Sequence, residues 1–368
     1  MELRGYVLQT HHTVLTGDAR TIPPVADASV HLVVTSPPYP MVAMWDEAFG
    51  AFNPDAASAL QAGNGMAAFE AMHLVLDAVW SECRRVLVPG GFLCVNIGDA
   101  TRSVTDADGD SEFCLYPNHA RILASAMRLG FTPLPDILWR KPNNSPNKFM
   151  GSGMLPAGAY VTYEHEYILV LRKGGKRAFD AGEKVRRTES AYFWEERNVW
   201  FSDLWTDLRG ARQELGEQDV RERSAAFPFE LPYRLIHMFA MQGDVVLDPF
   251  AGTGTTMAAA LAAGRSSIGV EREAGLASTI DRTLRRAVDL GRERVVDRLA
   301  NHEGFMRARE AAGKQAGHVS AHYGFPVITR QEVAMRLPVA RSVQDGHVGV
   351  LAEYDFSRPG PGALFGRS

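Results

Sequence analysis

Two short loops near opposite ends of the chain contain residues whose types and spacing could do chemistry. The first is Thr35-Ser36-Pro37-Pro38-Tyr39, which directly follows the apolar run Val30–Thr35. Two successive prolines fix φ and remove two N–H donors, so the carbonyl groups of Ser36 and Pro37 are held in one direction. A side-chain oxygen and a carbonyl could accept both hydrogens of an amine on a base. This favours the pyramidal form of the amine, whose nitrogen lone pair can attack a methyl group. Tyr39 offers a face on which a flipped-out base can stack. An ordinary proline turn beside a core tyrosine is the alternative.

The second loop is Asp248-Pro249-Phe250-Ala251-Gly252-Thr253-Gly254-Thr255-Thr256, which follows the apolar residues 245–247. Gly252 and Gly254 let the backbone approach a ligand closely, and Glu271 at the end of the next apolar run could accept both hydroxyls of a ribose. The loop is neither a G-x-G-x-x-G fingerprint nor a P-loop. Asp248 would repel a pyrophosphate but suits a cationic ammonium group, which S-adenosylmethionine has. The sequence therefore predicts S-adenosylmethionine as the cofactor and no metal.

The elements that must position these loops alternate between short apolar runs and longer helical patterns, which is typical of a sheet with crossover helices. The helical patterns cover 67–87, 118–129, 231–241, a stretch ending at 263, and 279–298. Strands are expected at 13–16, 30–35, 92–97, 135–139, 167–171, 244–247 and 268–270. Pro89-Gly90-Gly91 is expected to break the chain between helix and strand. The regular pattern is lost at 179–226, which we expect to lie outside the main sheet, and the tail after His302 is less regular.

Composition excludes several classes. The charged fraction of 22% and hydrophobic fraction of 46% are those of a soluble globular protein. No apolar run or signal pattern indicates a membrane or secretion, so a cytoplasmic location is expected. The three scattered cysteines, Cys83, Cys94 and Cys114, lack the spacing of a zinc site or a disulfide framework.

The net charge of −4 does not by itself indicate nucleic-acid binding, but basic residues gather locally. Ten lie between residues 140 and 187, against four acidic residues. Charge alone leaves open whether this segment is a solvated face or a surface that contacts phosphates.

Together these residues resemble the β class of DNA amino-methyltransferases of restriction-modification systems. The resemblance runs with gaps from about Leu15 to Glu271. It includes the segments 84–91 and 95–99, Trp139-Arg140-Lys141-Pro142-Asn143, and the segment 227–236 that precedes the glycine loop. The resemblance implies a Rossmann-like α/β methyltransferase sheet in circularly permuted order, because the proline loop comes first, with a target-recognition region inserted between the middle strands and residue 227. In this family Ser-Pro-Pro-Tyr mostly accompanies cytosine N4, whereas Asp-Pro-Pro-Tyr mostly accompanies adenine N6.

The resemblance also implies roles for individual residues. The catalytic residues are Ser36, Pro37, Pro38 and Tyr39. The cofactor-binding residues are Asp18, Thr35, Phe229, Asp248, Pro249, Phe250, Ala251, Gly252, Gly254, Thr255 and Glu271, with Asp18 accepting the adenine amino group. The basic residues expected to contact DNA are Arg140, Lys141, Lys148, Arg172, Lys173, Lys176 and Arg177.

The expected organisation is a catalytic part at 1–178, the target-recognition insertion at 179–226, a cofactor-binding part at 227–300 and a C-terminal extension at 301–368. The expected substrate is double-stranded DNA, and the expected product is N4-methylcytosine. A cognate restriction endonuclease is a possible further partner. The enzyme itself is expected to be a monomer or a homodimer. Adenine N6 remains the alternative product. The motif order disfavours methylation of a protein glutamine or of RNA. The intact motifs disfavour a catalytically silent DNA-binding protein. The absence of a Pro-Cys dipeptide argues against a cytosine-C5 enzyme.

Overall fold

The computed structural model describes residues 8–105, 109, 111–141, 150–151, 154–208, 227–346 and 349–359. Its main sheet consists of β1 (Leu8–Thr16), β2 (Val30–Thr35), β3 (Leu87–Ile97), β6 (Phe131–Pro133), β7 (Ile137–Arg140), β10 (His165–Lys173), β11 (Leu204–Trp205), β12 (Val245–Asp248), β13 (Ser266–Glu271), β16 (Val339–Asp345) and β17 (Val350–Asp355). The strand order is β11-β7-β10-β3-β2-β12-β13-β1-β17-β16, with β6 paired to β10.

Five central strands, β3, β2, β12, β13 and β1, run parallel. Their last residues therefore lie along one edge of the sheet, which we call the carboxyl edge. The strand β10 runs antiparallel to β3, so it begins at this edge. Neighbouring strands β2 and β12 end at the two loops, although more than 200 residues separate them in sequence. The expected α/β fold is thus confirmed.

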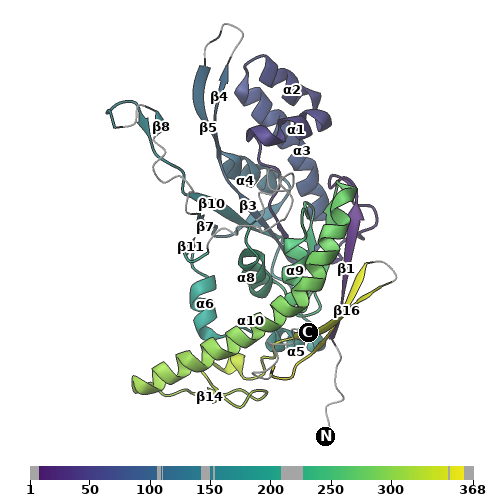
Figure 1. The fold of residues 1–368 in the computed structure, drawn as a ribbon, viewed down its shortest axis with the longest axis vertical. Helices are drawn as coiled ribbons and strands as arrows, with labels where there is room; N and C mark the ends of the chain where they lie inside the picture. The colour runs from purple at the N-terminus through teal and green to yellow at the C-terminus, as the bar shows by residue number, and fades with distance from the viewer. Residues whose placement is uncertain are drawn as a thin grey trace.

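Helices cover both faces of the sheet (Figure 1). The helices are α1 (Asp46–Phe52), α2 (Pro54–Gln61), α3 (Gly65–Val86), α4 (Asn118–Arg128), α5 (Ala181–Glu189), α6 (Trp194–Trp200), α8 (Glu230–Phe239), α9 (Thr255–Ala262) and α10 (Ala277–Ala311). On one face, α3 and α4 pack on Val33, Val95 and Leu169. On the other face, α8 and α9 pack on Leu32, Val34 and Ile168. Alternate residues of one strand thus enter opposite cores, as the pleat requires.

The predicted helix at 67–87 is confirmed as α3. It begins where the Asn64 side chain accepts a hydrogen bond from the backbone N–H of Ala67, which caps the first turn. The helix ends at Val86, before Pro89-Gly90-Gly91 as expected, but the strand starts earlier than residue 92. The strand β3 begins at Leu87 and continues through these residues with a register shift against β2. Gly90 has φ of +80°, and its missing side chain leaves room for the backbone of Arg177.

The stretch 179–226 does not lie wholly outside the main sheet, which corrects that expectation for its described part. Leu204 and Trp205 form β11, which pairs with β7 at the sheet edge. The helices α5 and α6 lie low in Figure 1, away from the carboxyl edge. The stretch looks irregular in sequence because its buried aromatic residues, Phe193, Trp200 and Trp205, lie in or beside elements too short to show a regular apolar period.

The tail is also more regular than the sequence indicates. The strands β16 and β17 extend the sheet beyond β1, and Ala340, Ala352 and Tyr354 pack against α9 and α10. The shorter elements before them are η1 (Ala43–Trp45), η2 (Ala274–Leu276), η3 (Arg330–Glu332) and the pair β14 (His318–Val319) and β15 (Pro326–Val327). Among the described residues, no helix combines the length and apolar character that a membrane crossing requires.

Two hairpins and the helices α1 and α2 project beyond the carboxyl edge (Figure 1). The hairpins are β4 (Ala100–Thr105) with β5 (Ser111–Tyr116), and β8 (Met150–Gly151) with β9 (Ala159–Tyr160). The rings of Phe113 and Tyr160 stack at 4.9 Å, so the two hairpins touch.

Candidate active site

The proline loop and the glycine loop meet at one buried carboxylate. Asp248, at the end of β12, is 3% exposed. It accepts hydrogen bonds from Thr35 Oγ1 at 2.7 Å, from Thr256 Oγ1 at 2.7 Å and from the backbone N–H of Phe250 at 3.0 Å. These contacts join the end of β2, the glycine loop and the first turn of α9. The structure therefore brings the two loops together.

Burial raises the pKa of Asp248 to about 6, against the opposing effect of the hydrogen bonds from Thr256 and Thr35. Both carboxylate oxygens already have donors in the chain. Asp248 therefore holds the loops in register, a role the sequence did not reveal, and its negative charge acts on the adjacent loop mainly through space.

The backbone of the glycine loop is open at Gly252. This residue has φ of +53°, and a methyl group added at its Cα would have the Phe250 carbonyl oxygen as its nearest neighbour, at 3.9 Å. Gly254 has φ of +85° and packs closely on Ile280 instead. The first glycine thus leaves space for a ligand, whereas the second allows α9 and α10 to pack.

The remaining loop residues support this turn. Pro249 and Ala251 are buried, and Ala251 N–H donates to the Val270 carbonyl. Phe250 is half-buried with its ring edge-on to Trp80, and Thr255 is the first residue of α9.

Two further carboxylates lie at the carboxyl edge. Glu271, at the end of β13, accepts from Gly252 N–H and from Glu273 N–H, both at 2.8 Å. Asp18, just beyond β1, is held by the Arg20 guanidinium at 2.6 Å, and these hydrogen bonds hold the pKa of Asp18 below its usual range. Strands β1 and β13 are neighbours, so the edge presents both acids beside the glycine loop.

Phe229 is half-buried at the start of α8, between the cores under α8 and α10. Its ring stacks on Tyr233 with centroids 5.5 Å apart.

The proline loop faces a polar network that the sequence did not indicate. Ser36 and Tyr39 are half-buried, and the Tyr39 hydroxyl contacts Ser36, Asn96 and Glu166. Asn96 and Glu166 lie on the paired strands β3 and β10. Burial and the neighbouring Glu166 charge raise the pKa of Tyr39 well above its usual value. The available signal was a polar residue inside the apolar run 92–97 and another directly before the apolar run 167–171.

The basic residues expected to contact DNA do not form one surface. Arg140 ends β7 at the carboxyl edge, and the adjacent Lys141 pairs with Glu166 at 2.8 Å. Arg172 and Lys173 are the last residues of β10. Because β10 is antiparallel to β3 and begins at the carboxyl edge, they lie at the opposite edge of the sheet, which we call the far edge.

At that far edge, two of the side chains serve the fold. Lys173 Nζ donates to the Leu87 carbonyl at 2.6 Å, and Arg177 pairs with buried Asp244 at 2.8 Å. Lys176 is exposed there, and Lys148 lies outside the described residues. Lys173 and Arg177 thus lie at the far edge with partners in the core, away from Arg140 and Lys141, and their contact with DNA stays a prediction.

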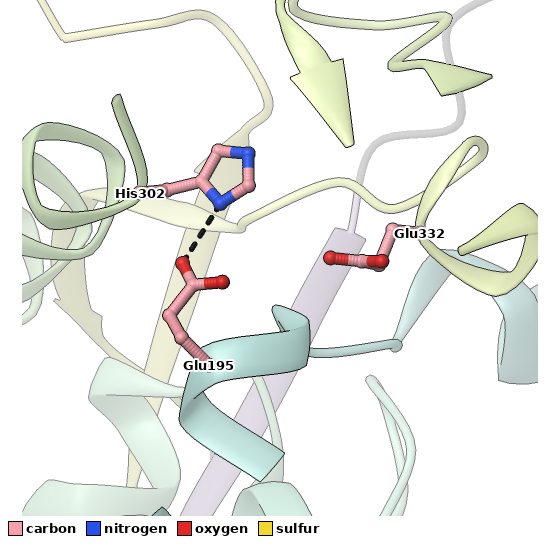
Figure 2. Close-up of side chains that lie close together, drawn as sticks. All are labelled: Glu195, His302 and Glu332. Carbon is pink, nitrogen blue, oxygen red and sulfur yellow. Dashed lines mark hydrogen bonds and ion pairs between the residues drawn. The ribbon is translucent and has the colours of Figure 1, made fainter. Parts of the chain in front are cut away.

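A second polar cluster consists of Glu195, His302 and Glu332, whose side chains face one another (Figure 2). Their nearest ligand-type atoms lie within 4.8 Å. His302 contacts Glu195 Oε1 at 2.8 Å and the Pro326 carbonyl at 2.9 Å, one through each ring nitrogen.

Glu332 is likewise engaged: it accepts from Trp194 N–H at 2.9 Å and from Thr329. Because both ring nitrogens of His302 and both oxygens of Glu332 have partners, the cluster serves as an ion pair that fastens α10 to α6 and the C-terminal segment.

Comparisons with known proteins identify the family of this chain. The family model described as DNA methylase, for N6 and N4 methyltransferases, matches residues 30–282. The chain is 48% identical over 337 residues to the type II methyltransferase M.MthZI of Methanothermobacter thermautotrophicus, covering 91% of this chain and 92% of the relative. It is 46% identical over 285 residues to the type II methyltransferase M.MjaI of Methanocaldococcus jannaschii, covering 74% and 91% of the two chains.

Among solved structures, the fold matches TTHA0409 of Thermus thermophilus, assigned to the DNA modification methylases. The TM-score is 0.56 at 34% identity, covering 75% of this chain and 95% of the other. A complex of TTHA0409 with S-adenosyl-L-methionine gives the same TM-score and identity, covering 75% and 94%. With its proline loop and glycine loop joined at one sheet edge, this chain belongs to the N6/N4 family of DNA methyltransferases.

Proposed function

We propose that this chain methylates the exocyclic N4 amine of cytosine at a specific sequence in double-stranded DNA, with S-adenosylmethionine as the methyl donor. The observation that carries the proposal is the Thr35–Asp248 contact, which places Ser36-Pro37-Pro38-Tyr39 beside the open glycine loop. The motif order, with the proline loop before the glycine loop, supports the circularly permuted class.

The chemistry of the donor set fits the cofactor. The edge beside Gly252 carries Asp18, Asp248 and Glu271. Acids suit ribose hydroxyls, an adenine amino group and a cationic ammonium, whereas a pyrophosphate needs donors and positive charge. The complex of TTHA0409 with S-adenosyl-L-methionine supports the same choice.

In the proposed mechanism, Glu271 and Asp18 would hold the adenosine, and the open backbone at Gly252 would admit the methionine part, with Asp248 attracting its ammonium. When bound, S-adenosylmethionine supplies an electrophilic methyl group. Ser36 and the Pro37 carbonyl would accept the two amine hydrogens of the flipped-out base, and Tyr39 would stack on its ring. These contacts orient the amine lone pair and exclude water from it.

The choice of cytosine rests on Ser36, since a serine rather than an aspartate opens the proline loop. DNA would lie over the carboxyl edge, contacted by Arg140, Lys141 and the projecting hairpins. The proposal places sequence recognition in these hairpins rather than in α5 and α6. The type II relatives support a partner endonuclease with the same recognition sequence, acting with this enzyme in the cytoplasm.

Mass spectrometry of nucleosides tests the proposal. Unmodified genomic DNA is incubated with the enzyme and isotopically labelled S-adenosylmethionine, and sequencing then maps the modified positions. We expect labelled N4-methylcytosine at one short sequence. Labelled N6-methyladenine would overturn the base assignment, and DNA binding without labelling would indicate a silent protein.

The variant Ser36→Ala tests the role of the serine hydroxyl. It should lose turnover while retaining cofactor affinity. Normal rates in Ser36→Ala would refute a role for this hydroxyl in orienting the amine.

A further inference from the structure

The Tyr39 hydroxyl is the centre of a hydrogen-bonded chain behind the proline loop. Its oxygen lies 3.0 Å from Glu166 Oε2, 3.0 Å from Asn96 Nδ2 and 3.2 Å from Ser36 Oγ. Asn96 Nδ2 also lies 2.7 Å from Glu166 Oε2, and Lys141 Nζ lies 2.8 Å from Glu166 Oε1. The chain therefore runs from Lys141 through Glu166 and Tyr39 to Ser36.

Counting hydrogens fixes the direction of this chain. An ionised carboxylate only accepts, and a lysine ammonium only donates, so Glu166 accepts from Lys141. Tyr39 has one hydroxyl hydrogen, and Glu166 is the neighbour that can take it. The Tyr39 oxygen then has lone pairs left, and Ser36 must donate its own hydrogen to one of them.

The orientation of Asn96 supports this count. In the assigned orientation its Nδ2 donates to Glu166, and its Oδ1 is buried with no partner among the described residues. Turning the amide over would place that oxygen 2.7 Å from a carboxylate oxygen, which is strongly repulsive. The unpaired Oδ1 is the lesser cost, so Asn96 is a donor and cannot take the hydrogen of Tyr39.

The two prolines and a glycine keep the chain in this arrangement. Pro37 and Pro38 have no N–H group that could bond to Ser36 Oγ. The Tyr39 ring and the Glu166 stem pack on Gly98, where an added Cβ would lie 3.1 Å from the ring. Burial on Gly98 holds both side chains in the geometry of the chain.

We propose that Glu166 is a positioning residue that, acting through Tyr39, forces the Ser36 hydroxyl to present only lone pairs to the target base. The inference rests on the proposed function, because it concerns the amine that Ser36 receives. An acceptor-only Ser36 binds an exocyclic amine and repels an exocyclic carbonyl. The site therefore selects cytosine against uracil, and it would equally select adenine against hypoxanthine.

This direction of the hydroxyl also changes the expected contacts of Ser36. A serine hydroxyl can in general donate to a ring nitrogen of either base. Here its hydrogen is already used, so Ser36 contacts the amine alone. Ser36 and the Pro37 carbonyl both face the amine as acceptors, so a base carbonyl in its place leaves acceptors facing each other. Only the Ser36 part of this discrimination depends on Glu166.

The test compares binding of two DNA duplexes that carry the mapped sequence. One has cytosine and the other uracil at the target position, both opposite an abasic site so that neither base has to be unpaired. Affinities are measured by fluorescence anisotropy with S-adenosylhomocysteine present, which allows no transfer. We expect the unmodified enzyme to prefer cytosine by about tenfold or more, the scale of about 1.4 kcal/mol for one hydrogen bond.

Two substitutions at Glu166 separate hydrogen acceptance from other effects. In Glu166→Met, the Asn96 amide is no longer fixed by the carboxylate and could turn over to accept from Tyr39. Glu166→Met is therefore made in an Asn96→Leu background. There Tyr39 donates to Ser36 instead, so the Ser36 hydrogen turns toward the base. The cytosine preference should fall by about threefold or more, and the part due to the Pro37 carbonyl should remain. In Glu166→Gln, the amide oxygen can still accept from Tyr39 and Asn96. The amide nitrogen then faces Lys141, whose exposed side chain can turn to water. Most of the preference should therefore remain.

Glu164→Gln is the matched control, since Glu164 lies two residues away and pairs with exposed Arg140. It should keep the full preference. If Glu166→Met keeps the preference of the unmodified enzyme, or if Glu166→Gln loses as much as Glu166→Met, the proposal is wrong.

A double-mutant cycle shows whether Glu166 acts through Tyr39. Tyr39→Phe keeps the ring and removes the hydroxyl, so Glu166→Met should then change the preference and kcat less than about twofold further. Multiplicative losses would contradict the proposal. If Glu166→Met does not fold, as judged by circular dichroism, Tyr39→Phe alone must show the reduced preference. If the mapped product is N6-methyladenine, adenine and hypoxanthine replace the two bases, so the failure of the base assignment is distinct from failure here.

Discussion

Thr35 Oγ1 donates a hydrogen bond to Asp248 Oδ1 across 2.7 Å, and this contact joins two loops that lie 213 residues apart in sequence. Both residues are buried at the ends of adjacent parallel strands. The distance between the proline loop and the glycine loop is thus set by this side-chain hydrogen bond together with the pairing of β2 and β12. A displacement of about 1 Å between reacting groups can cost about 100-fold in rate, so this contact matters for catalysis as well as for stability.

Thr35→Val should weaken this connection. Valine has the shape of threonine but no donor, so a buried carboxylate loses one of its hydrogen bonds. We expect cofactor affinity to fall by about tenfold, since losing a partner of a buried charged group costs about 1–3 kcal/mol. Isothermal titration with S-adenosylhomocysteine measures this. Thr35→Ser restores the donor and should recover most of the affinity; equal losses in both variants would refute the role of the hydroxyl.

Cofactor affinity should depend on pH through Asp248. Burial raises the pKa of Asp248 to about 6, so the carboxylate is charged at pH 7.5 and mostly protonated at pH 5. A cationic ammonium is attracted by the charged form alone. Affinity for S-adenosylhomocysteine should therefore be high above pH 6 and fall as the pH drops through about 6. In Asp248→Asn the affinity should be low at every pH; an unchanged pH profile in that variant would assign the titration to another group.

The two glycines of the loop should respond differently to alanine. Gly252→Ala meets no atom within ordinary contact distance except one at 3.9 Å, so its main cost is the positive φ, about 1 kcal/mol, and the methyl group would occupy ligand space. In Gly254→Ala the added Cβ lies 2.9 Å from Ile280 Cγ2. We expect Gly252→Ala to lose cofactor affinity with a small change in Tm, and Gly254→Ala to lower Tm by several degrees. The reverse pattern in thermal melts and titrations would contradict this assignment.

The central elements were predictable because each has a strong local signal. The run Val30–Thr35 is β2 to the residue, and the expected helix at 118–129 is α4. The ends of β12 and β13 lie where the acids Asp248 and Glu271 were expected. Apolar period and terminal acids are properties of a few neighbouring residues, so they can be read without the rest of the chain.

The contacts that join distant segments were not predictable in the same way. Glu166 and Asn96 meet Tyr39 only because β10 is antiparallel to β3, which no single segment reveals. The same pairing places Lys173 at the far edge, so a cluster that is continuous in sequence divides between two edges of the sheet. The strands β16 and β17 depend on β1 as a template, which explains why the tail looked irregular.

The ion pair of His302 should make stability depend on pH. Burial lowers the pKa of His302, but the hydrogen bonds to Glu195 and the Pro326 carbonyl outweigh it, so the pKa is raised overall. A raised pKa means that the stabilisation is fully present below the unfolded value of about 6.5 and is lost as the pH rises through the folded value. The difference in Tm between the unmodified protein and His302→Gln should therefore be largest at and below about pH 6 and shrink as the pH rises above the unfolded pKa. A difference that grows with pH would mean that the neutral ring is the stabilising form.

DNA binding should distinguish the two edges of the sheet. Arg140 has a side chain 60% exposed at the carboxyl edge, whereas Arg172 and Lys176 lie at the far edge. If DNA lies over the proline loop, Arg140→Ala should weaken binding several-fold and lower the salt slope by about one, because one phosphate contact is lost. Arg172→Ala and Lys176→Ala should leave affinity and slope unchanged in anisotropy titrations from about 50 to about 200 mM salt. Equal losses at both edges would require a DNA path around the whole sheet, and a loss confined to the far edge would separate the DNA from Ser36 and Tyr39 and so contradict the proposed active site.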